Sequence, residues 1–309
     1  MSIIEKAVGK TGRRDNERQD SGVKDTSQSS ETGALSPNDD RYPDESADYS
    51  AVTVKLPTAK FQQLGMITLD RPRSQIAEEY RIIKRPLLMN IAGKTASPIA
   101  YSNMIMVTSS LQGEGKTFTA LNLAMSMALE EDKTVLFVDA DFSKGTASSL
   151  LEIPAGRPGL IDVLEDENLE ISDVLLHTNV SNLRIIPTGH LHERSTEMLA
   201  SGGMQELMHE LSVRYPDRVV VFDSPPLLLT TEAAVLASLM GQIVFVVAAE
   251  QTSRESISAA LEHISGDKVV GTVLNKTQKY IWDHFRYGHG YGYGYGYGGY
   301  GQSSEVGTG

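Results

Sequence analysis

The chain has 309 residues, of which 40% are hydrophobic, and this is enough for one α/β domain of about 200 residues with extensions. Its formal net charge of −12 argues against a nucleic-acid-binding surface, and the absence of cysteine excludes disulfides, thiolate metal sites and a cysteine nucleophile. No apolar run approaches the ~20 residues needed to cross a bilayer, so we expect a cytoplasmic protein that reaches a membrane only through a partner.

The first 50 residues are rich in Ser, Asp, Glu, Arg and Gly and contain few large apolar side chains. Such a segment buries too little apolar surface to offset the entropy of ordering it, so we predict that residues 1–50 are disordered. Within this segment Ile3, Ile4 and Val8 fit one face of a short helix. A frayed terminus and a peptide that docks to a partner both remain open.

Residues 51–102 form an approach segment with one predicted helix. Ser74 is a suitable N-cap for a helix from about Gln75 to Ala92, with Pro86 inside it. Its apolar residues have helical spacing: Ile76, Tyr80, Ile83, Leu87 and Ile91. Three charged residues are three positions apart and line one face: Glu78, Arg81 and Lys84. The pattern alone favours a solvated stripe of ion pairs over a charged subunit-contact surface.

From Asn103 to about residue 280, short β-branched runs alternate with helical stretches. Strands are predicted at residues 104–107, 134–138, 182–186, 218–222, 243–248 and 269–274. Helices are predicted at residues 118–131, 196–215, 232–239 and 254–263. This alternation predicts a P-loop NTPase-like, doubly wound, mostly parallel α/β sheet with helices on both faces and strands buried on both sides.

A glycine-bearing loop joins the first of these strands to the first helix. Strand, loop and helix in this order are typical of a phosphate-binding loop, where backbone N–H groups converge on an anion. Lys116 adds a positive charge for the β- and γ-phosphates, and Thr117 offers a hydroxyl to Mg²⁺. The predicted nucleotide-binding residues of the loop are Ser110, Leu111, Gln112, Gly113, Glu114, Gly115, Lys116, Thr117 and Phe118. The pattern GxxxxGK[ST] has glycine where this chain has Ser110, and a glycine-rich turn that binds nothing is the alternative.

Acidic residues follow two of the predicted strands. Asp139 and Asp141 end the strand at 134–138, and Asp223 follows the strand at 218–222. Because ligands bind at the carboxyl ends of the strands in such sheets, we expect these acids to meet the phosphate loop. Phosphoryl transfer needs a phosphate cradle, a metal and a group that positions the acceptor. We therefore predict the catalytic residues Lys116, Asp139, Asp141 and Asp223, and the metal ligands Thr117, Asp139 and Asp223. For a lone strand-end aspartate, the alternative is a helix cap.

The C-terminal tail, residues 281–309, alternates tyrosine with glycine. Glycine keeps the backbone mobile and prevents a packed core. We expect these tyrosines to be phosphorylated on a flexible tether: Tyr287, Tyr291, Tyr293, Tyr295, Tyr297 and Tyr300. A low-complexity tail without this role is the alternative.

The motifs SS-LQ-GEGKT, VLFVDADF and VVVFDSPPLLL, followed by a Tyr-rich C-terminus, resemble the bacterial tyrosine kinase (BY-kinase) family. Three further segments resemble the tyrosine autokinases encoded with exopolysaccharide and exosortase (PEP-CTERM) loci: residues 65–90, 196–204 and 215–238. The resemblance covers about residues 60–280.

The resemblance implies ATP and Mg²⁺ as cofactors, with Walker A at Ser110–Thr117, Walker A′ at Asp139 and Asp141, and Walker B at Asp223. It also implies an adenine contact at Asn275. Glu78, Arg81 and Lys84 match the family's ExxRxxR subunit-contact pattern, which replaces the solvated stripe as our expectation. Members form homo-oligomeric rings in which one subunit's tail enters its neighbour's site. They are activated by a membrane chain-length (co-polymerase) protein of polysaccharide export.

The chain departs from the family pattern at three places. Lys84 replaces the last Arg of ExxRxxR, with Arg85 beside it, and Gln112 stands where Pro is usual. After Asp141 the sequence at residues 142–145 is Phe-Ser-Lys-Gly, which bears on contacts to the acceptor more than on nucleotide binding.

We therefore expect an ATP-dependent protein-tyrosine autokinase that phosphorylates its own C-terminal tyrosines in trans and regulates exopolysaccharide biosynthesis or export. It is expected to be recruited to the inner face of the plasma membrane by its partner, without inserting into the membrane. Two alternatives stay open: a partition or MinD-like switch ATPase, and a non-catalytic nucleotide-binding adaptor of a polysaccharide export complex. Partition ATPases carry a second lysine where this chain has Leu111, which argues against the first.

Overall fold

The computed structural model describes residues 53–277 apart from 96, 143–144, 191–193 and 214–216. These residues lie within the unit that spans Ser50–Gly309. The predicted disordered segment 1–50 and the tyrosine tail 281–309 lie outside the described residues. None of the helices in the described part of the chain combines the length and apolarity that crossing a bilayer requires.

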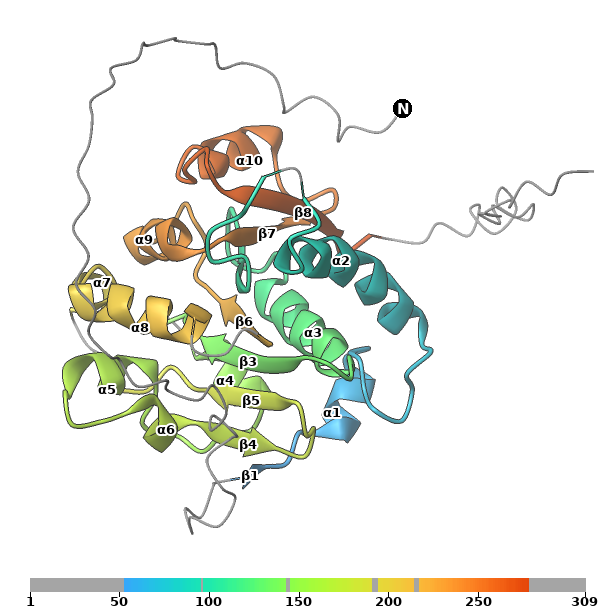
Figure 1. The fold of residues 1–309 in the computed structure, drawn as a ribbon. Coiled ribbons are helices and arrows are strands. Elements are labelled where there is room, and N and C mark those ends of the chain that lie inside the picture. Colours follow the sequence, from blue (N-terminus) through green and yellow to red (C-terminus); the bar gives the residue numbers. More distant parts are fainter. Residues whose placement is uncertain (1–52, 96, 143–144, 191–193, 214–216, 278–309) are drawn as a thin grey trace, which may run out of the picture. The chain divides into compact units, whose positions relative to one another are not determined.

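The described residues form an eight-stranded sheet in the order β1-β4-β5-β3-β6-β2-β7-β8 (Figure 1). The strands are β1 (Thr53–Val54), β2 (Met104–Ser109), β3 (Thr134–Asp139), β4 (Leu176–Thr178), β5 (Leu183–Ile186), β6 (Arg218–Asp223), β7 (Gln242–Ala248) and β8 (Val269–Asn275). All pairs are parallel except β4 with β5. The predicted mostly parallel sheet is confirmed, whereas the short strands β1 and β4 carry too few residues to show a period in the sequence.

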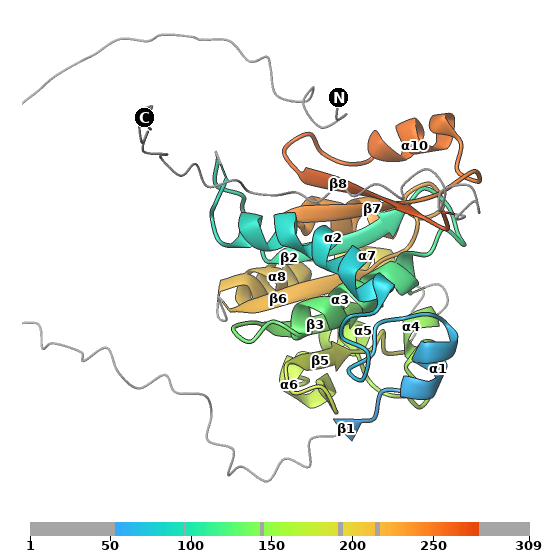
Figure 2. The same cartoon turned by 90° about the vertical axis from the view of Figure 1, so that its right-hand side faces the viewer.

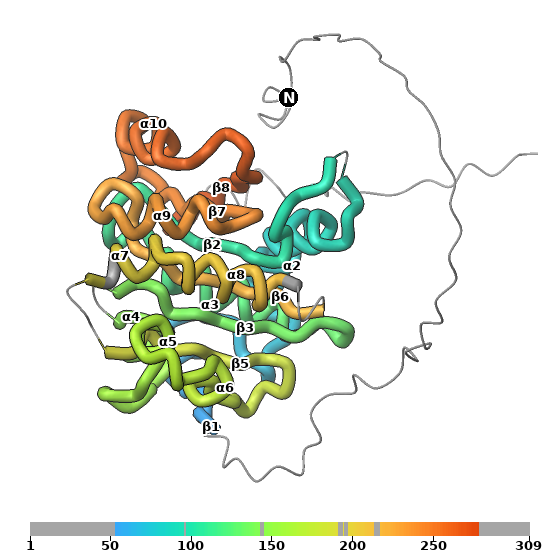
Figure 3. Tube along the Cα trace, turned by 60° about the vertical axis from the view of Figure 1, so that its left-hand side comes forward, coloured from blue at the N-terminus to red at the C-terminus, as the bar shows by residue number. Residues whose placement is uncertain are grey.

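Ten helices lie between the strands in the described part of the chain. They are α1 (Thr58–Gln63), α2 (Gln75–Ile91), α3 (Lys116–Ala128), α4 (Thr146–Leu150), α5 (Leu160–Glu165), α6 (Ile171–Val174), α7 (Ser195–Leu199), α8 (Gly202–Val213), α9 (Thr231–Leu239) and α10 (Arg254–Leu261). Figures 2 and 3 show these helices on both sides of the sheet.

Two apolar cores form on the two faces of the sheet because alternate strand residues point to opposite sides. Ile105 and Val107 of β2 belong to one core, which α1, α2, α3 and α4 cover. Met104 and Met106 belong to the other core, which α5 to α10 cover. The continuous apolar runs of the central strands are thus explained by burial on both faces, as predicted.

Helix α2 begins where the sequence predicted it. The Ser74 hydroxyl accepts a hydrogen bond from the N–H of Ala77, which caps the first turn, and Pro86 lies inside the helix. The helix packs on α3, which is buried along almost its whole length. The preceding segment also docks there, since the N–H of Ile67 donates to Asn122 Oδ1 of α3 at 2.7 Å. The approach segment therefore completes the domain's core.

Two expectations were wrong. The helix predicted over 196–215 is divided into α7 and α8, because Ser201 accepts a hydrogen bond from the N–H of Met204 and so caps a new helix that starts with two glycines. Strand β8 was expected to be buried on both sides, but it is an edge strand with largely exposed side chains, including Leu274 at 60%.

Candidate active site

The glycine-bearing loop lies at the carboxyl end of β2, between β6 and β7 in the middle of the sheet. Gly113 and Gly115 have φ values of +79° and +99°, a region that favours glycine. A Cβ atom on Gly115 would come within 2.0 Å of Asn275 Nδ2, so a side chain fits there only if the Asn275 amide moves away. Ser110 is not among the described residues with positive φ, and its backbone therefore does not need the glycine of the common pattern.

Side chains that follow β7 and end β8 form hydrogen bonds to the phosphate loop. The buried Glu114 carboxylate accepts hydrogen bonds from the N–H of Leu111 at 2.7 Å and from the hydroxyl of Thr252, which follows β7. Asn275, the last residue of β8, donates its side-chain amide to the carbonyl of Glu114 at 2.9 Å. The sequence placed Asn275 at the nucleotide site but gave no signal for the bond from Thr252.

The first residues of α3 complete the anion-binding side of the site. Lys116 begins the helix and is buried, and Thr117 follows it. The first turn of α3 contains no acidic residue, so the positive end of the helix dipole is not neutralised by its own sequence. A phosphate group placed at this helix start would meet free backbone N–H groups and the ammonium of Lys116.

The two strand-end acids Asp139 and Asp223 lie side by side. They are register partners on the parallel strands β3 and β6, and β6 also pairs with β2, which leads into the loop. Neighbouring strands are about 5 Å apart, so the two carboxylates occupy one small region at the sheet's carboxyl edge. The expected meeting of the acids with the phosphate loop is therefore seen in the structure.

Burial and mutual repulsion raise the pKa values of this pair. Asp223 has no exposed surface, and burial followed by the charge of Asp139 raises its pKa well above the ordinary value. The hydroxyl of Thr117 and the ammonium of Lys116 partly oppose that rise. Burial also raises the pKa of Asp139, although Ser148 donates to Asp139 Oδ2 through its N–H and its hydroxyl, at 3.1 and 2.9 Å.

Several buried oxygens of the site have no hydrogen-bond partner among the described residues. They are both carboxylate oxygens of Asp223, Oδ1 of Asp139 and the hydroxyl of Ser110. Buried polar atoms are normally satisfied, so such a group indicates a missing cation, water or ligand. Within the described chain no cluster of three or more His, Asp or Glu could hold a metal by itself. Mg²⁺ fits these residues, because it binds one or two protein oxygens together with phosphates and water.

Of the remaining predicted residues, Asp141 is described, whereas the tail tyrosines are not. Asp141 is 5% exposed, and its charge adds to the raised pKa of Asp223, so it belongs to the same acidic group. Residues 143 and 144 of the altered segment after Asp141 lie outside the described residues, as do all the tail tyrosines.

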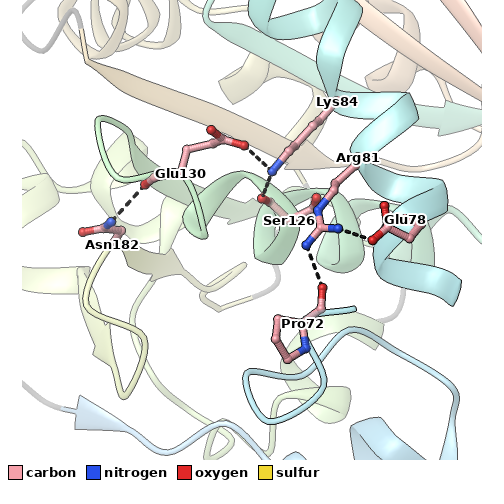
Figure 4. Close-up of polar contacts among 7 residues, drawn as sticks. All are labelled: Pro72, Glu78, Arg81, Lys84, Ser126, Glu130 and Asn182. Carbon is pink, nitrogen blue, oxygen red and sulfur yellow. Dashed lines mark hydrogen bonds and ion pairs between the residues drawn. The ribbon is translucent and has the colours of Figure 1, made fainter. Parts of the chain in front are cut away.

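The three charged residues of α2 do not form one exposed stripe. Glu78 and Arg81 have exposed side chains and form an ion pair, but the side chain of Lys84 is only 8% exposed (Figure 4). The expectation that all three line one surface is wrong, because Lys84 turns toward α3.

Similar proteins identify the family to which this chain belongs. A family model of the AAA domain (AAA_31) matches residues 102–276. The tyrosine-protein kinase YwqD of Bacillus subtilis (strain 168) is 30% identical over 229 residues, which cover 74% of this chain and 91% of YwqD. The chain belongs to the bacterial tyrosine kinase family. The resemblance drawn from its motifs is confirmed.

Two further relatives of this BY-kinase differ in length and organisation. The succinoglycan biosynthesis transport protein ExoP of Rhizobium meliloti (strain 1021) is 32% identical over 225 residues, which cover 71% of this chain and 27% of ExoP. The crystal structure of the chimerical protein CapA2B2 shares 27% identity with a TM-score of 0.59, and the match covers 72% of this chain and 99% of that chain. The matched region therefore spans nearly all of YwqD and about a quarter of ExoP.

Proposed function

We propose that this BY-kinase is an ATP- and Mg²⁺-dependent protein-tyrosine autokinase that phosphorylates its own C-terminal tyrosine cluster, mainly between subunits. One observation supports this most strongly. Two buried carboxylates, Asp139 and Asp223, lie at the carboxyl ends of the adjacent strands β3 and β6, and they have unsatisfied oxygens and raised pKa values. Strand β6 also pairs with β2, which leads into the phosphate loop. Such an arrangement is unfavourable unless a cation and a phosphate complete it.

Each residue has a distinct role in the proposed site. The loop backbone from residue 110 to 117 and the Lys116 ammonium would bind the phosphates, and Asn275 would contact the base. The Thr117 hydroxyl with Asp223 and Asp139 would hold Mg²⁺. When bound, the metal neutralises charge that develops on the phosphates.

The acceptor side is assigned to Asp139 and Asp141. One of these carboxylates accepts a hydrogen bond from the tyrosine hydroxyl and aligns its oxygen with the γ-phosphorus. The bond from phosphorus to the phenol oxygen forms as the bond to the ADP oxygen breaks, and the phenol proton passes to the carboxylate.

The tail supplies the acceptors. Six tyrosines between residues 287 and 300 alternate largely with glycine, so the segment can extend into a neighbouring subunit's site. Each phosphotyrosine adds roughly −1.5 to −2 charges. Accumulated phosphate on a chain whose net charge is already −12 would drive neighbouring tails apart and loosen a homo-oligomeric ring.

The proposed setting is exopolysaccharide biosynthesis or export. It is supported by the similarity to ExoP, whose name states a role in succinoglycan biosynthesis and transport. We propose a membrane chain-length (co-polymerase) protein as the partner that recruits this kinase to the inner face of the plasma membrane.

The deciding experiment is incubation of the purified full-length chain with Mg·ATP, followed by site-resolved mapping of phosphotyrosine by mass spectrometry. We expect phosphate on the tail tyrosines of the wild type and none on Lys116→Met. ATP hydrolysis with an unmodified tail would support the switch ATPase instead. Nucleotide binding with neither hydrolysis nor transfer would support the non-catalytic adaptor.

A further inference from the structure

Lys84 of helix α2 is turned toward the end of the phosphate-loop helix α3. Its ammonium lies 2.5 Å from the carbonyl oxygen of Ser126 and 2.5 Å from Glu130 Oε1 (Figure 4). The side chain is 8% exposed, whereas that of Glu130 is 39% exposed. The Lys84 ammonium is therefore paired within its own chain, and its side chain presents little surface to another subunit.

The end of α3 needs such a group. The last carbonyls of a helix lack partners within the helix and carry its negative end charge. The N–H of Glu130, four residues after Ser126, donates to Met127 instead, and the last turn of α3 contains no basic residue. Lys84 supplies from α2 the cation that the sequence of α3 does not provide.

Glu130 also connects the end of α3 to the segment before β5. The carbonyl of Glu130 accepts a hydrogen bond from Asn182 Nδ2 at 3.3 Å, just before β5 (Figure 4). Lys84, Glu130 and Asn182 thus fix the C-terminal end of α3 from two directions. The opposite end of that helix is Lys116 and the phosphate loop, about 18 Å from Ala128 at 1.5 Å per residue.

The other two charged residues of the pattern are engaged differently. Arg81 pairs with Glu78 and donates to the carbonyl of Pro72 at 2.8 Å, and both charged side chains remain about half exposed. The ExxRxxK spacing therefore combines an exposed pair with a buried cation, and only the exposed pair is available to another molecule.

We propose that Lys84 is a positioning residue of the nucleotide site, which acts by fixing the C-terminal end of α3 and is not a subunit contact. Because α3 is one rigid, buried element, a shift at its end is transmitted to the backbone N–H groups at its start. This inference rests on the nucleotide binding of the proposed function, but not on transfer to tyrosine.

Helix α2 has a second anchor, which makes a control possible. Asn90 Nδ2 donates to Gln242 Oε1 at 2.6 Å, and Gln242 Nε2 donates to the carbonyl of Leu87 at 3.3 Å. Loss of the Asn90 contact should weaken the docking of α2 without releasing the end of α3. Arg85 is an exposed cation next to Lys84 and serves as a second control.

The test compares Lys84→Met, Lys84→Arg, Asn90→Ala and Arg85→Met in the full-length chain. Affinity for Mg·ADP is measured by calorimetry, well below the melting temperature of each variant, and self-association by sedimentation. We expect Lys84→Met to bind Mg·ADP about threefold to tenfold more weakly. Lys84→Arg, which keeps the cation, Asn90→Ala and Arg85→Met should stay within about twofold of wild type.

Wild-type affinity in Lys84→Met, together with loss of self-association, would make Lys84 a subunit contact and overturn the proposal. Equal weakening of Mg·ADP binding in Asn90→Ala would mean that Lys84 only helps to dock α2, and it would also overturn the proposal. If Lys84→Met does not fold, Glu130→Gln replaces it, with weaker Mg·ADP binding expected and unchanged affinity overturning the proposal. A chain that binds Mg·ADP but leaves its tail unmodified refutes the kinase function and leaves this inference standing.

Discussion

Asp139 and Asp223 are register partners on adjacent parallel strands, and burial raises the pKa values of both carboxyls. Two carboxylates in one dry region repel each other until a cation or a proton intervenes. The chain therefore keeps a site that is unfavourable when empty, and its ligand relieves that cost. The first two predictions follow from this relationship.

Asp223→Asn is expected to raise the melting temperature of the ligand-free protein, and more so at high pH. The pKa of Asp223 is higher in the folded state than its ordinary value of 3.8. Stability from this group is therefore complete below that value and is lost as the pH rises through the raised pKa. The amide variant avoids the loss, and each kcal/mol gained corresponds to about 2–4 °C in a domain of this size.

Melting curves followed by circular dichroism at about pH 5 and about pH 8 measure the effect. Asp267→Asn is the control, because the Asp267 side chain is 72% exposed and should show no such trend. A gap between wild type and Asp223→Asn that does not widen with pH contradicts the argument.

Binding of Mg²⁺ with nucleotide is expected to release protons at mildly acidic pH. The raised pKa of Asp223 means that its carboxyl holds a proton over a wider pH range than usual, and a metal ligand must be deprotonated. Calorimetric titrations of Mg·ADP in buffers with different ionisation enthalpies count the protons released. The count should fall toward zero at high pH. A binding enthalpy that is independent of the buffer near pH 5 would falsify the prediction.

Thr252→Val is expected to weaken nucleotide binding without touching the nucleotide. The hydroxyl of Thr252 bonds to the buried carboxylate of Glu114, which in turn accepts the N–H of Leu111. Removal of one partner leaves a buried charge less satisfied, at a cost of about 1–3 kcal/mol, and loosens the loop. Calorimetry should show roughly fivefold weaker Mg·ADP binding at the lower end of that range. Thr252→Ser keeps the hydroxyl and should bind like wild type; equal weakening in both variants would point to lost packing.

The sequence indicates which residues gather at the carboxyl edge of the sheet, but not the long-range side-chain contacts around them. Asp139 and Asp223 end apolar strands, and Lys116 follows the loop after β2, so the parallel topology alone brings them to one edge. The burial of Lys84 depends on a carbonyl 42 residues away in α3, and no helical period reveals that contact. The bond between Thr252 and Glu114 spans 138 residues and is equally invisible.

Two of the predicted elements differ from the structure, one because of its place in the sheet and one because a local cap was overlooked. Strand β8 has the apolar, β-branched sequence of a central strand, and only its place at the edge of the sheet exposes Leu274. The break between α7 and α8 was locally encoded, since Ser201 precedes two glycines, but one continuous helix was predicted there.

Gly115→Ala is expected to weaken nucleotide binding for two separable reasons. Position 115 has φ = +99°, where a side chain costs about 1–3 kcal/mol, and its Cβ would lie 2.0 Å from Asn275 Nδ2. Strain of this size alone corresponds to roughly fivefold or more in affinity. In Gly115→Ala/Asn275→Ala the collision disappears but the strained φ remains, so Mg·ADP affinity measured by calorimetry should recover only in part.

Gly65→Ala is the matched control, because Gly65 has φ = +69° with nothing within 4 Å of its Cβ position. It should lower the melting temperature and leave Mg·ADP affinity unchanged. Full recovery in the double variant would mean that the collision with Asn275 alone requires glycine at position 115. Wild-type affinity in Gly115→Ala itself would mean that the phosphates do not sit against this part of the loop.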